Sequence, residues 1–317
     1  MIKKVPVPLC GVMLGTAALG NLLQGLFNNV LAPEAGIGDP IRNICGVFAA
    51  FLLVLILLKL IMFPGMVKED MQNPIMAGVS ATFPMGLMIL STYIKPFAGG
   101  FAQIIWFIAI ALHIALIIYF TMKFVAKFEL GKVFTTWFIV YVGIAVAGVT
   151  ATVYEKTGLG AITFWFGLVT LIPLLFVVSK RYASDLPMPD PAKPLIGIYA
   201  APMSLCVAAY VQSVMPKNFA FLLIMWAVAT VLYVFGLVKS LPLVKNFFPS
   251  FAAFTFPFVI SAIASFQTMA CAKNMEHPLP WLKPIVLIEA IIAVVFVVFV
   301  YAKFMKFIFA GPKPEQK

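Results

Sequence analysis

The sequence predicts an all-α integral membrane protein with ten transmembrane helices. Its 317 residues are 63% hydrophobic and only 10% charged, whereas soluble domains contain about 45–50% apolar and about 25% charged residues. Apolar stretches of the length that spans a bilayer, about 20 residues, recur along the chain between short connections. No connection is long enough to hold a soluble domain, so we expect one transmembrane domain over residues 1–317.

The apolar segments are separated by residues that end helices. The predicted spans are 9–28, 43–62, 75–94, 101–120, 133–152, 161–180, 195–214, 220–239, 250–269 and 285–304. Most connections contain proline or glycine, which interrupt helices. These residues are Pro33, Pro40, Pro64, Gly65, Gly99, Gly100, Gly158, Pro187, Pro189, Pro191, Pro216, Pro242, Pro278 and Pro280.

Lysine and arginine are distributed unevenly between the two sides that ten spans define. With the N-terminus placed inside, 16 of the 22 basic residues fall on the inner side, from Lys3 to Lys313 and Lys317. The outer side has Arg42, Lys95, Lys156, Lys217, Lys273 and Lys283. Basic loops face the cytoplasm, so both termini are expected there. The absence of a transit peptide favours a bacterial-type plasma (inner) membrane.

The odd-numbered spans differ in composition from the even-numbered spans. Windows of twenty residues contain 30 Gly, Ser, Thr, Asn and Gln residues in the five odd spans and 9 in the five even spans. Small and hydroxylated residues allow close helix contacts and supply hydrogen bonds away from lipid. We therefore expect the odd helices to form an inner ring and the even helices to form an outer ring that faces lipid.

A weak internal repeat points to a bend at one depth in each odd span. The tripeptide Thr-Phe-Pro occurs in the third and ninth spans, as Thr82-Phe83-Pro84 and Thr255-Phe256-Pro257. The seventh, fifth and first spans have Pro202, Gly143 and Gly15 at the equivalent depth. Irregular backbone at membrane depth is tolerated inside protein or along a water-filled cavity. Five helical hairpins with such bends predict a central pore.

The chemistry of the odd spans excludes most other functions. Their windows contain no Asp, Glu, Lys, Arg or His, so a ring of acids for cations is missing. No catalytic cluster, nucleotide-binding loop or metal motif is present. We therefore expect no enzyme activity, no cofactor and no metal. The net charge of +11 is not concentrated in one tail, so we expect no nucleic-acid partner. A neutral conduit with lysines near its cytoplasmic ends favours small anions or neutral solutes.

Phe256 is the candidate gate of this conduit. Its ring stands beside a proline in the middle of a span that is rich in small and hydroxylated residues. A hydrophobic constriction gates by dewetting or by steric block. Phe83 is the repeat-related alternative, and either ring also fits a simple space-filling role at its bend. The candidate pore-lining residues are Gly15, Phe83, Pro84, Gly143, Pro202, Thr255, Pro257 and Ser261.

Two ionisable residues occur deep in even spans. Glu289 is near the outer interface, and His113 is closer to the middle of its span. Ionisable groups inside a membrane are candidates for function. Proton coupling is one interpretation of both residues, and a hydrogen-bonded structural role is the other.

The chain resembles the tellurite-resistance/dicarboxylate transporter (TDT) family. The resemblance is carried by the ten-span layout, by Phe254-Thr255-Phe256-Pro257 in the ninth span, and by the opening segment Pro8-Leu9-Cys10-Gly11-Val12-Met13-Leu14-Gly15-Thr16-Ala17-Ala18-Leu19-Gly20-Asn21. The family includes bacterial tellurite-resistance proteins, fungal malate permeases, sulfite efflux pumps and the slow anion channels of plant guard cells.

The resemblance implies a homotrimer with one pore in each subunit, occluded by the phenylalanine that corresponds to Phe256. It leaves two mechanisms open. One is an anion channel or permease with Phe256 as gate, and the other is a proton-coupled carrier of malate, sulfite or tellurite that uses Glu289 or His113. A membrane scaffold or enzyme without a conduit is the remaining class. The sequence does not identify the anion.

Overall fold

The computed structural model describes residues 1–310, and the predicted all-helical architecture with ten spans is confirmed over this part of the chain. Within it, ten helical segments are long and apolar enough to cross a membrane. They are Leu9–Leu31, Gly38–Met62, Pro74–Ile94, Gly99–Val125, Thr136–Tyr154, Thr157–Tyr182, Asp190–Ser213, Phe219–Lys245, Pro249–Asn274 and Leu282–Phe309. Each predicted span corresponds to one of them, and several helices extend a few residues further.

The even spans and the first span each contain one long α-helix. These helices are α1 (Leu9–Leu26), α2 (Gly38–Met62), α6 (Gly99–Phe120), α9 (Thr157–Tyr182), α11 (Phe219–Ser240) and α13 (Leu282–Phe309). A short helix, α3 (Pro64–Asp70), lies in the connection after α2.

The other four odd spans are interrupted. The third consists of α4 (Pro74–Ser80) and α5 (Thr82–Ile94). The fifth consists of α7 (Thr136–Val142), the 3₁₀ turn η6 (Gly143–Ala145), α8 (Val146–Thr150) and η7 (Ala151–Tyr154). In the seventh, the 3₁₀ helix η8 (Asp190–Ala200) precedes α10 (Pro202–Ser213). In the ninth, η10 (Pro249–Phe254) precedes α12 (Phe256–Asn274).

Hydroxyl side chains satisfy backbone carbonyls at three of these interruptions. A proline follows each of them and contributes no N–H to the carbonyl four residues earlier, and the hydroxyls bond to other carbonyls close to it. The Oγ1 atoms of Thr82 and Thr255 each donate to the carbonyl oxygen three residues earlier, at 2.7 Å. Ser204 Oγ donates to the carbonyl oxygen of Ala200 at 2.8 Å. Local sequence therefore fixes these bends.

The expected bend of the first span at Gly15 is wrong. Helix α1 continues through this residue without interruption. A Cβ atom at Gly15 would lie 2.6 Å from Thr255 Cβ and 2.8 Å from the backbone nitrogen of Phe256. No proline follows Gly15 in α1, and the missing side chain of this glycine lets the bend of the ninth span approach α1.

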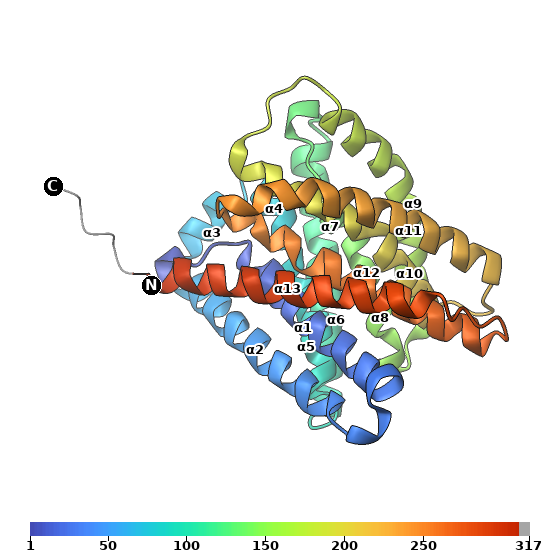
Figure 1. Cartoon of the computed structure of the whole chain (residues 1–317). Helices are drawn as coiled ribbons and strands as arrows, with labels where there is room; N and C mark the ends of the chain where they lie inside the picture. The colour runs from blue at the N-terminus through green and yellow to red at the C-terminus, as the bar shows by residue number, and fades with distance from the viewer. Residues whose placement is uncertain (311–317) are drawn as a thin grey trace.

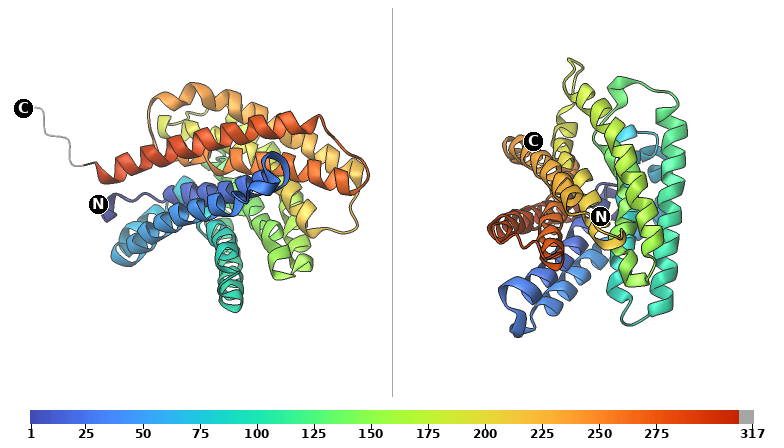
Figure 2. Two further views of the ribbon diagram at one scale, coloured as in Figure 1. Left: turned by 60° about the horizontal axis from the view of Figure 1, so that its bottom comes forward. Right: turned by 90° about the vertical axis from the view of Figure 1, so that its right-hand side faces the viewer.

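The odd spans are buried and the even spans are exposed. The buried share of residues in the apolar windows is 67–89% for the five odd spans and 28–39% for the five even spans. The odd spans contact one another in chain order, and the first also contacts the ninth through α1 and α12. Figures 1 and 2 show the helices packed in one bundle. The pathway described below lies between the odd spans.

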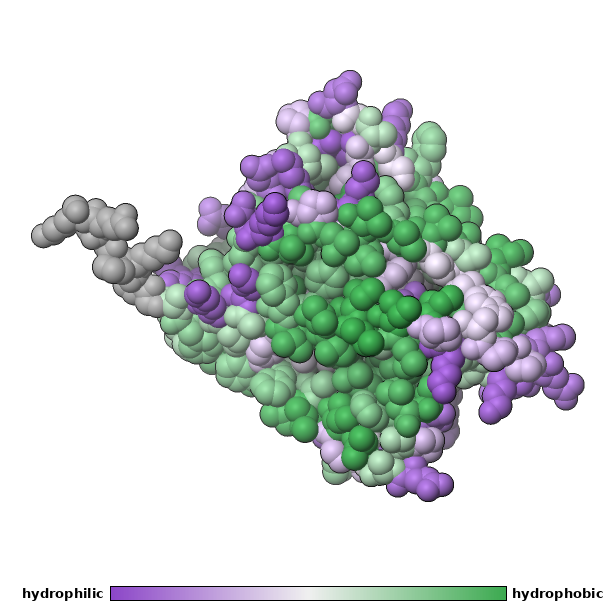
Figure 3. Space-filling view, in the orientation of Figure 1, coloured by the Kyte–Doolittle hydropathy of each residue, from purple (hydrophilic) through white to green (hydrophobic). Residues whose placement is uncertain are grey.

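The exposed surface fits a bilayer. Figure 3 shows hydrophobic residues over the middle of one face and hydrophilic residues toward its edges. The two ends of the described chain lie together (Figure 1), and Lys4 Nζ donates to the carbonyl oxygen of Ala310 at 3.0 Å. An even number of spans returns the chain to its starting side. Lys313 and Lys317, which were counted on the inner side, lie outside the described residues.

Candidate functional site

A small cavity lies where the five odd spans converge. We call it the narrow cavity, and its volume is about 50 Å³. Every lining residue belongs to an odd span or to the turn before the first one. The lining residues are Pro8, Gly11, Val79, Thr82, Met85, Phe138, Ile139, Val142, Gly143, Leu195, Ile198, Ala201, Pro202, Leu205, Ser250, Ala252, Ala253, Phe256 and Pro257.

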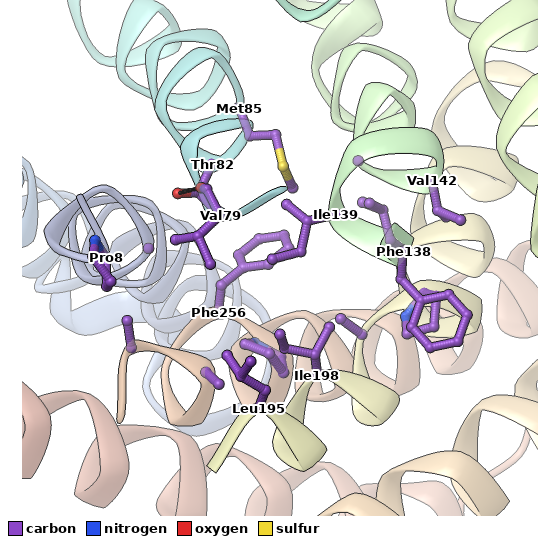
Figure 4. A pocket seen from close by; sticks show the side chains of 18 of the residues that line it. Pro8, Val79, Thr82, Met85, Phe138, Ile139, Val142, Leu195, Ile198 and Phe256 are labelled. Atoms are coloured by element: carbon purple, nitrogen blue, oxygen red, sulfur yellow. Dashed lines mark hydrogen bonds between the residues drawn. The ribbon is translucent and has the colours of Figure 1, made fainter. Parts of the chain in front are cut away.

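The ring of Phe256 stands inside the narrow cavity. Figure 4 shows it pointing between Val79 and Ile139, with Met85 and Ile198 on either side. The Phe256 side chain is 5% exposed. The residue is the first of α12, so the bend between η10 and α12 directs its side chain. The close approach of α1 at Gly15 holds this bend from behind.

A larger cavity lies on the other side of Phe256, toward the C-terminal ends of the odd spans. We call it the wide cavity, and its volume is about 420 Å³. Its lining residues are Ala18, Asn21, Leu22, Gln24, Arg42, Ile89, Thr92, Lys95, Pro96, Val146, Val149, Thr150, Thr152, Val153, Leu205, Gln212, Phe256, Ile260, Ile263, Phe266 and Gln267. Phe256 and Leu205 are shared by the two cavities. Their side chains therefore form the partition between them.

The narrow cavity is mainly apolar. Thr82 and Ser250 carry its only side-chain hydroxyls among the described lining residues, and none of these residues is ionisable. The Thr82 hydroxyl donates to the carbonyl oxygen of Val79, whereas Ser250 Oγ is buried without a hydrogen-bond partner. A narrow apolar passage with a bulky ring blocks ions by dewetting and steric exclusion.

Three helix N-termini also reach the narrow cavity. Thr82, Pro202 and Phe256 are the first residues of α5, α10 and α12, and all three line it. The N-terminus of a helix carries partial positive charge. The backbone therefore places three partial positive charges at the narrow cavity, where none of the described lining residues is basic, and Val142 places the partial negative charge of the α7 C-terminus there as well.

Two basic residues, Arg42 and Lys95, line the wide cavity. From the sequence, both were expected only as loop charges on the outer side. Arg42 is in the first turns of α2, because α2 begins at Gly38, five residues before the predicted start. Lys95 follows α5 directly. No Asp or Glu is among the described lining residues. A signal existed in the sequence, because Arg42 is the only arginine on the predicted outer side.

The predicted lining residues fall into three groups. Gly143, Pro202 and Pro257 line the narrow cavity. Thr255 and Gly15 line neither cavity and instead join the ninth span to the first. The Thr255 Oγ1 atom donates to the carbonyl oxygen of Gly11 at 3.0 Å. Thr255 and Gly15 therefore hold the Phe256 backbone in place on the side that faces α1.

Phe83, Pro84 and Ser261 lie elsewhere. Phe83 and Pro84 line a separate cavity between α1, α2, α5 and α6, so the structure does not bring them to Phe256. Ser261 Oγ contacts the carbonyl oxygens of Ala200 and Pro257, both at 2.9 Å. It faces a polar cluster behind α12.

Glu289 belongs to this cluster. Its side chain is 3% exposed and lies among Ser204, Ser261, Ser265 and Tyr233. Glu289 Oε2 and the Tyr233 hydroxyl are buried without hydrogen-bond partners. The cluster has no room for a water molecule, and none of its residues lines the narrow or the wide cavity.

His113 contacts the bend of the fifth span. Its Nε2 atom lies 2.9 Å from the carbonyl oxygen of Val140, near the point where η6 interrupts the helix. Its Nδ1 atom is buried without a partner. A Cβ atom at Gly143 would lie 3.0 Å from His113 Cε1. Over residues 1–310, neither histidine joins a group of three or more potential metal ligands.

Comparison with known families gives one match. A family model named SLAC1, described as voltage-dependent anion channel, matches residues 4–305, which is nearly the whole chain and includes all the lining residues of both cavities. No curated protein matches the chain.

Proposed function

Because this chain belongs to the SLAC1 family of voltage-dependent anion channels, which are transport proteins and not enzymes, we propose that it moves small inorganic or organic anions through the two cavities. The family that the sequence motifs indicated is thus confirmed, and the protein crosses the membrane ten times. The anion, the gate and the assembly are the parts of the proposal that experiments must test.

The position of Phe256 carries the proposal for the gate. Its ring occupies the narrow cavity and forms the partition to the wide cavity together with Leu205. A rotation of this ring joins the two cavities without moving a helix. In the resting pathway, the Phe256 ring and the Leu205 side chain then form the closure, and Phe256 is its movable part.

The electrostatics of the pathway support anions as the transported species. The passage has no acidic side chain among its described lining residues, and three helix N-termini face it. Arg42 and Lys95 add positive charge to the wide cavity. A cation would meet unfavourable potential along the whole route.

Currents through purified protein in planar bilayers test this proposal. In asymmetric chloride, we expect a small wild-type current and an increase of about tenfold or more in Phe256→Ala, equivalent to a barrier lower by about 1.4 kcal/mol. The reversal potential should lie near the equilibrium potential of the anion. Phe83→Ala is the matched control, because it removes the same ring from the same tripeptide in a different cavity. Equal currents in all three proteins would reject the gate.

We also propose a homotrimer in the plasma (inner) membrane with both termini in the cytoplasm. The exposed apolar residues of the even helices support a lipid-facing and subunit-facing outer surface. Mass measurement of the detergent-solubilised protein tests the assembly, and a mass other than three subunits would reject it.

A proton-coupled carrier is the second candidate, and the buried Glu289 Oε2 atom, which has no hydrogen-bond partner, favours it. In that case, uptake of malate or sulfite into vesicles should follow an imposed pH gradient and be lost in Glu289→Gln. Uptake that ignores the pH gradient would exclude this mechanism, whereas uptake that persists in the variant would exclude Glu289 as its coupling group.

A further inference from the structure

We propose that the wide cavity contains an anion-binding site in which the Arg42 guanidinium is the principal ligand and Lys95 the second. The ligand class is a small oxyanion or carboxylate. The site lies beyond the Phe256 partition and holds an anion next to the gate. This inference rests on the proposed function and specifies where and how its substrate is recognised.

Neutral groups fix the Arg42 guanidinium in place. Its Nε atom donates to Asn21 Oδ1 at 2.8 Å, and its Nη2 atom donates to Thr92 Oγ1 at 3.2 Å. The guanidinium carbon lies 4.0 Å from the centre of the Tyr93 ring. These contacts come from α1 and α5, so three helices define the position of one cation.

The Tyr93 ring is itself tightly held. The Tyr93 hydroxyl donates to the carbonyl oxygen of Ala17. A Cβ atom at Gly46 would lie 2.5 Å from the ring, and one at Gly20 would meet the hydroxyl oxygen. Two glycines on neighbouring helices thus make room for the aromatic surface under Arg42. The site is preorganised, which reduces the cost of binding.

In the described part of the chain, no carboxylate forms a contact ion pair with Arg42, although Asp39, one turn earlier on α2, interacts with it electrostatically at longer range. Among residues 1–310, no acidic oxygen lies within 4.0 Å of it. The nearest acid along α2, Asp39, accepts hydrogen bonds from Gln24 at 2.6 Å and from Asn28 at 3.3 Å. Gln24 of α1 and Asn28 of the helical turn that follows α1 hold this carboxylate. The guanidinium therefore keeps free N–H groups for an external anion.

The unused donors of Arg42 specify the ligand. Within the described chain, Nη1 makes no hydrogen bond, and Nη2 makes only the bond to Thr92. A free guanidinium edge binds two oxygens at once, which suits nitrate, carboxylate and related oxyanions better than a halide. Lys95 supplies a second, less directional charge on the same cavity. Its amine lies 5.3 Å from the centre of the Tyr154 ring.

Thermal unfolding of the purified wild-type protein with nitrate tests the site independently of transport. With fluoride, which is neither an oxyanion nor a carboxylate, holding the ionic strength constant, we expect a saturable increase in the unfolding temperature. The nitrate concentration that gives half of this increase should be about tenfold higher in Lys95→Gln. Arg42→Lys should preserve the response to chloride and weaken the response to nitrate. Lys156→Gln is the control, because it removes the same charge from an exposed position that does not line the cavity.

The site would be overturned if Lys95→Gln and Arg42→Lys both needed the same nitrate concentration as the wild type for half of the increase in unfolding temperature. The two variants are tested together because Arg42 also holds α1, α2 and α5 together, whereas Lys95 makes no hydrogen bond that is found within the described chain.

Currents separate this inference from the proposed function. In the Phe256→Ala background, Lys95→Gln should reduce anion conductance at low nitrate concentration, with little change at saturating nitrate. Unchanged conductance at every concentration would overturn a role of the site in transport. If no variant carried anion current but nitrate still stabilised the wild-type protein against unfolding, the channel function would be rejected. The anion-binding site would still be supported.

Discussion

Gly15 of α1 and Thr255 of the ninth span are packed so closely that a Cβ atom on the glycine would lie 2.6 Å from Thr255 Cβ. The same atom would lie 2.8 Å from the backbone nitrogen of Phe256. The position of the proposed gate therefore depends on a glycine in another span.

Gly15→Ala should destabilise the protein and disturb the gate. The neighbours are backbone and a β-branched side chain, which cannot move aside easily, and overpacking of this kind costs about 1–3 kcal/mol. We expect a lower midpoint temperature and an altered basal current. Gly65→Ala is the control, because a Cβ atom there meets nothing within 4 Å. A Gly15→Ala protein with wild-type stability and current would contradict the tight contact.

The size of residue 256 should set the resting current. In the series Phe256→Leu, Phe256→Val and Phe256→Ala, anion conductance should increase in that order, because each step removes volume from the partition. Leu205→Ala should increase the current less, since its side chain forms only part of the partition. Single-channel recording measures both effects, and a series without order would favour a space-filling role for the ring.

His113→Ala should cost stability without affecting pH dependence. The change removes the partner of the Val140 carbonyl oxygen beside the bend of the fifth span. A buried polar group left without a partner costs about 1–3 kcal/mol. His113→Gln should restore part of the loss by supplying an amide donor. Transport that loses its dependence on a pH gradient in both variants would instead assign proton coupling to this residue.

Orientation is tested by labelling introduced cysteines with a membrane-impermeant thiol reagent on intact cells. Lys156→Cys should react and Lys127→Cys should not, because the basic-residue count places residue 156 outside and residue 127 inside. The native cysteines Cys10, Cys206 and Cys271 are buried and Cys45 is half-buried, which limits background labelling. The reverse pattern would place the termini outside.

Much of the fold followed from simple patterns, but the direction of single side chains did not. The apolar composition and the prolines and glycines between segments predicted ten spans. The content of small and polar residues distinguished the buried spans from the exposed ones. The Thr-Phe-Pro repeat wrongly suggested that Phe83 and Phe256 are equivalent. Helix α5 begins at the threonine, whereas α12 begins at the phenylalanine. A shift of one residue turns a helical side chain by about 100°.

The two tripeptides therefore present different residues to the narrow cavity. Thr82 lines the narrow cavity and Phe83 faces a separate one, whereas Phe256 lines the narrow cavity and Thr255 faces α1. Arg42 was assigned to a loop because an apolar window starts only after the charged residues.

The predicted second span therefore began at residue 43 and excluded the first turns of α2, which contain Arg42.

The hydrogen bond from Thr255 to Gly11 joins positions 244 residues apart in the chain, so it can form only after the ninth span has been synthesised. The same span contains Phe256. The contact that holds the bend beside Phe256 therefore needs both the first and the ninth spans, and a chain truncated after the eighth span lacks it.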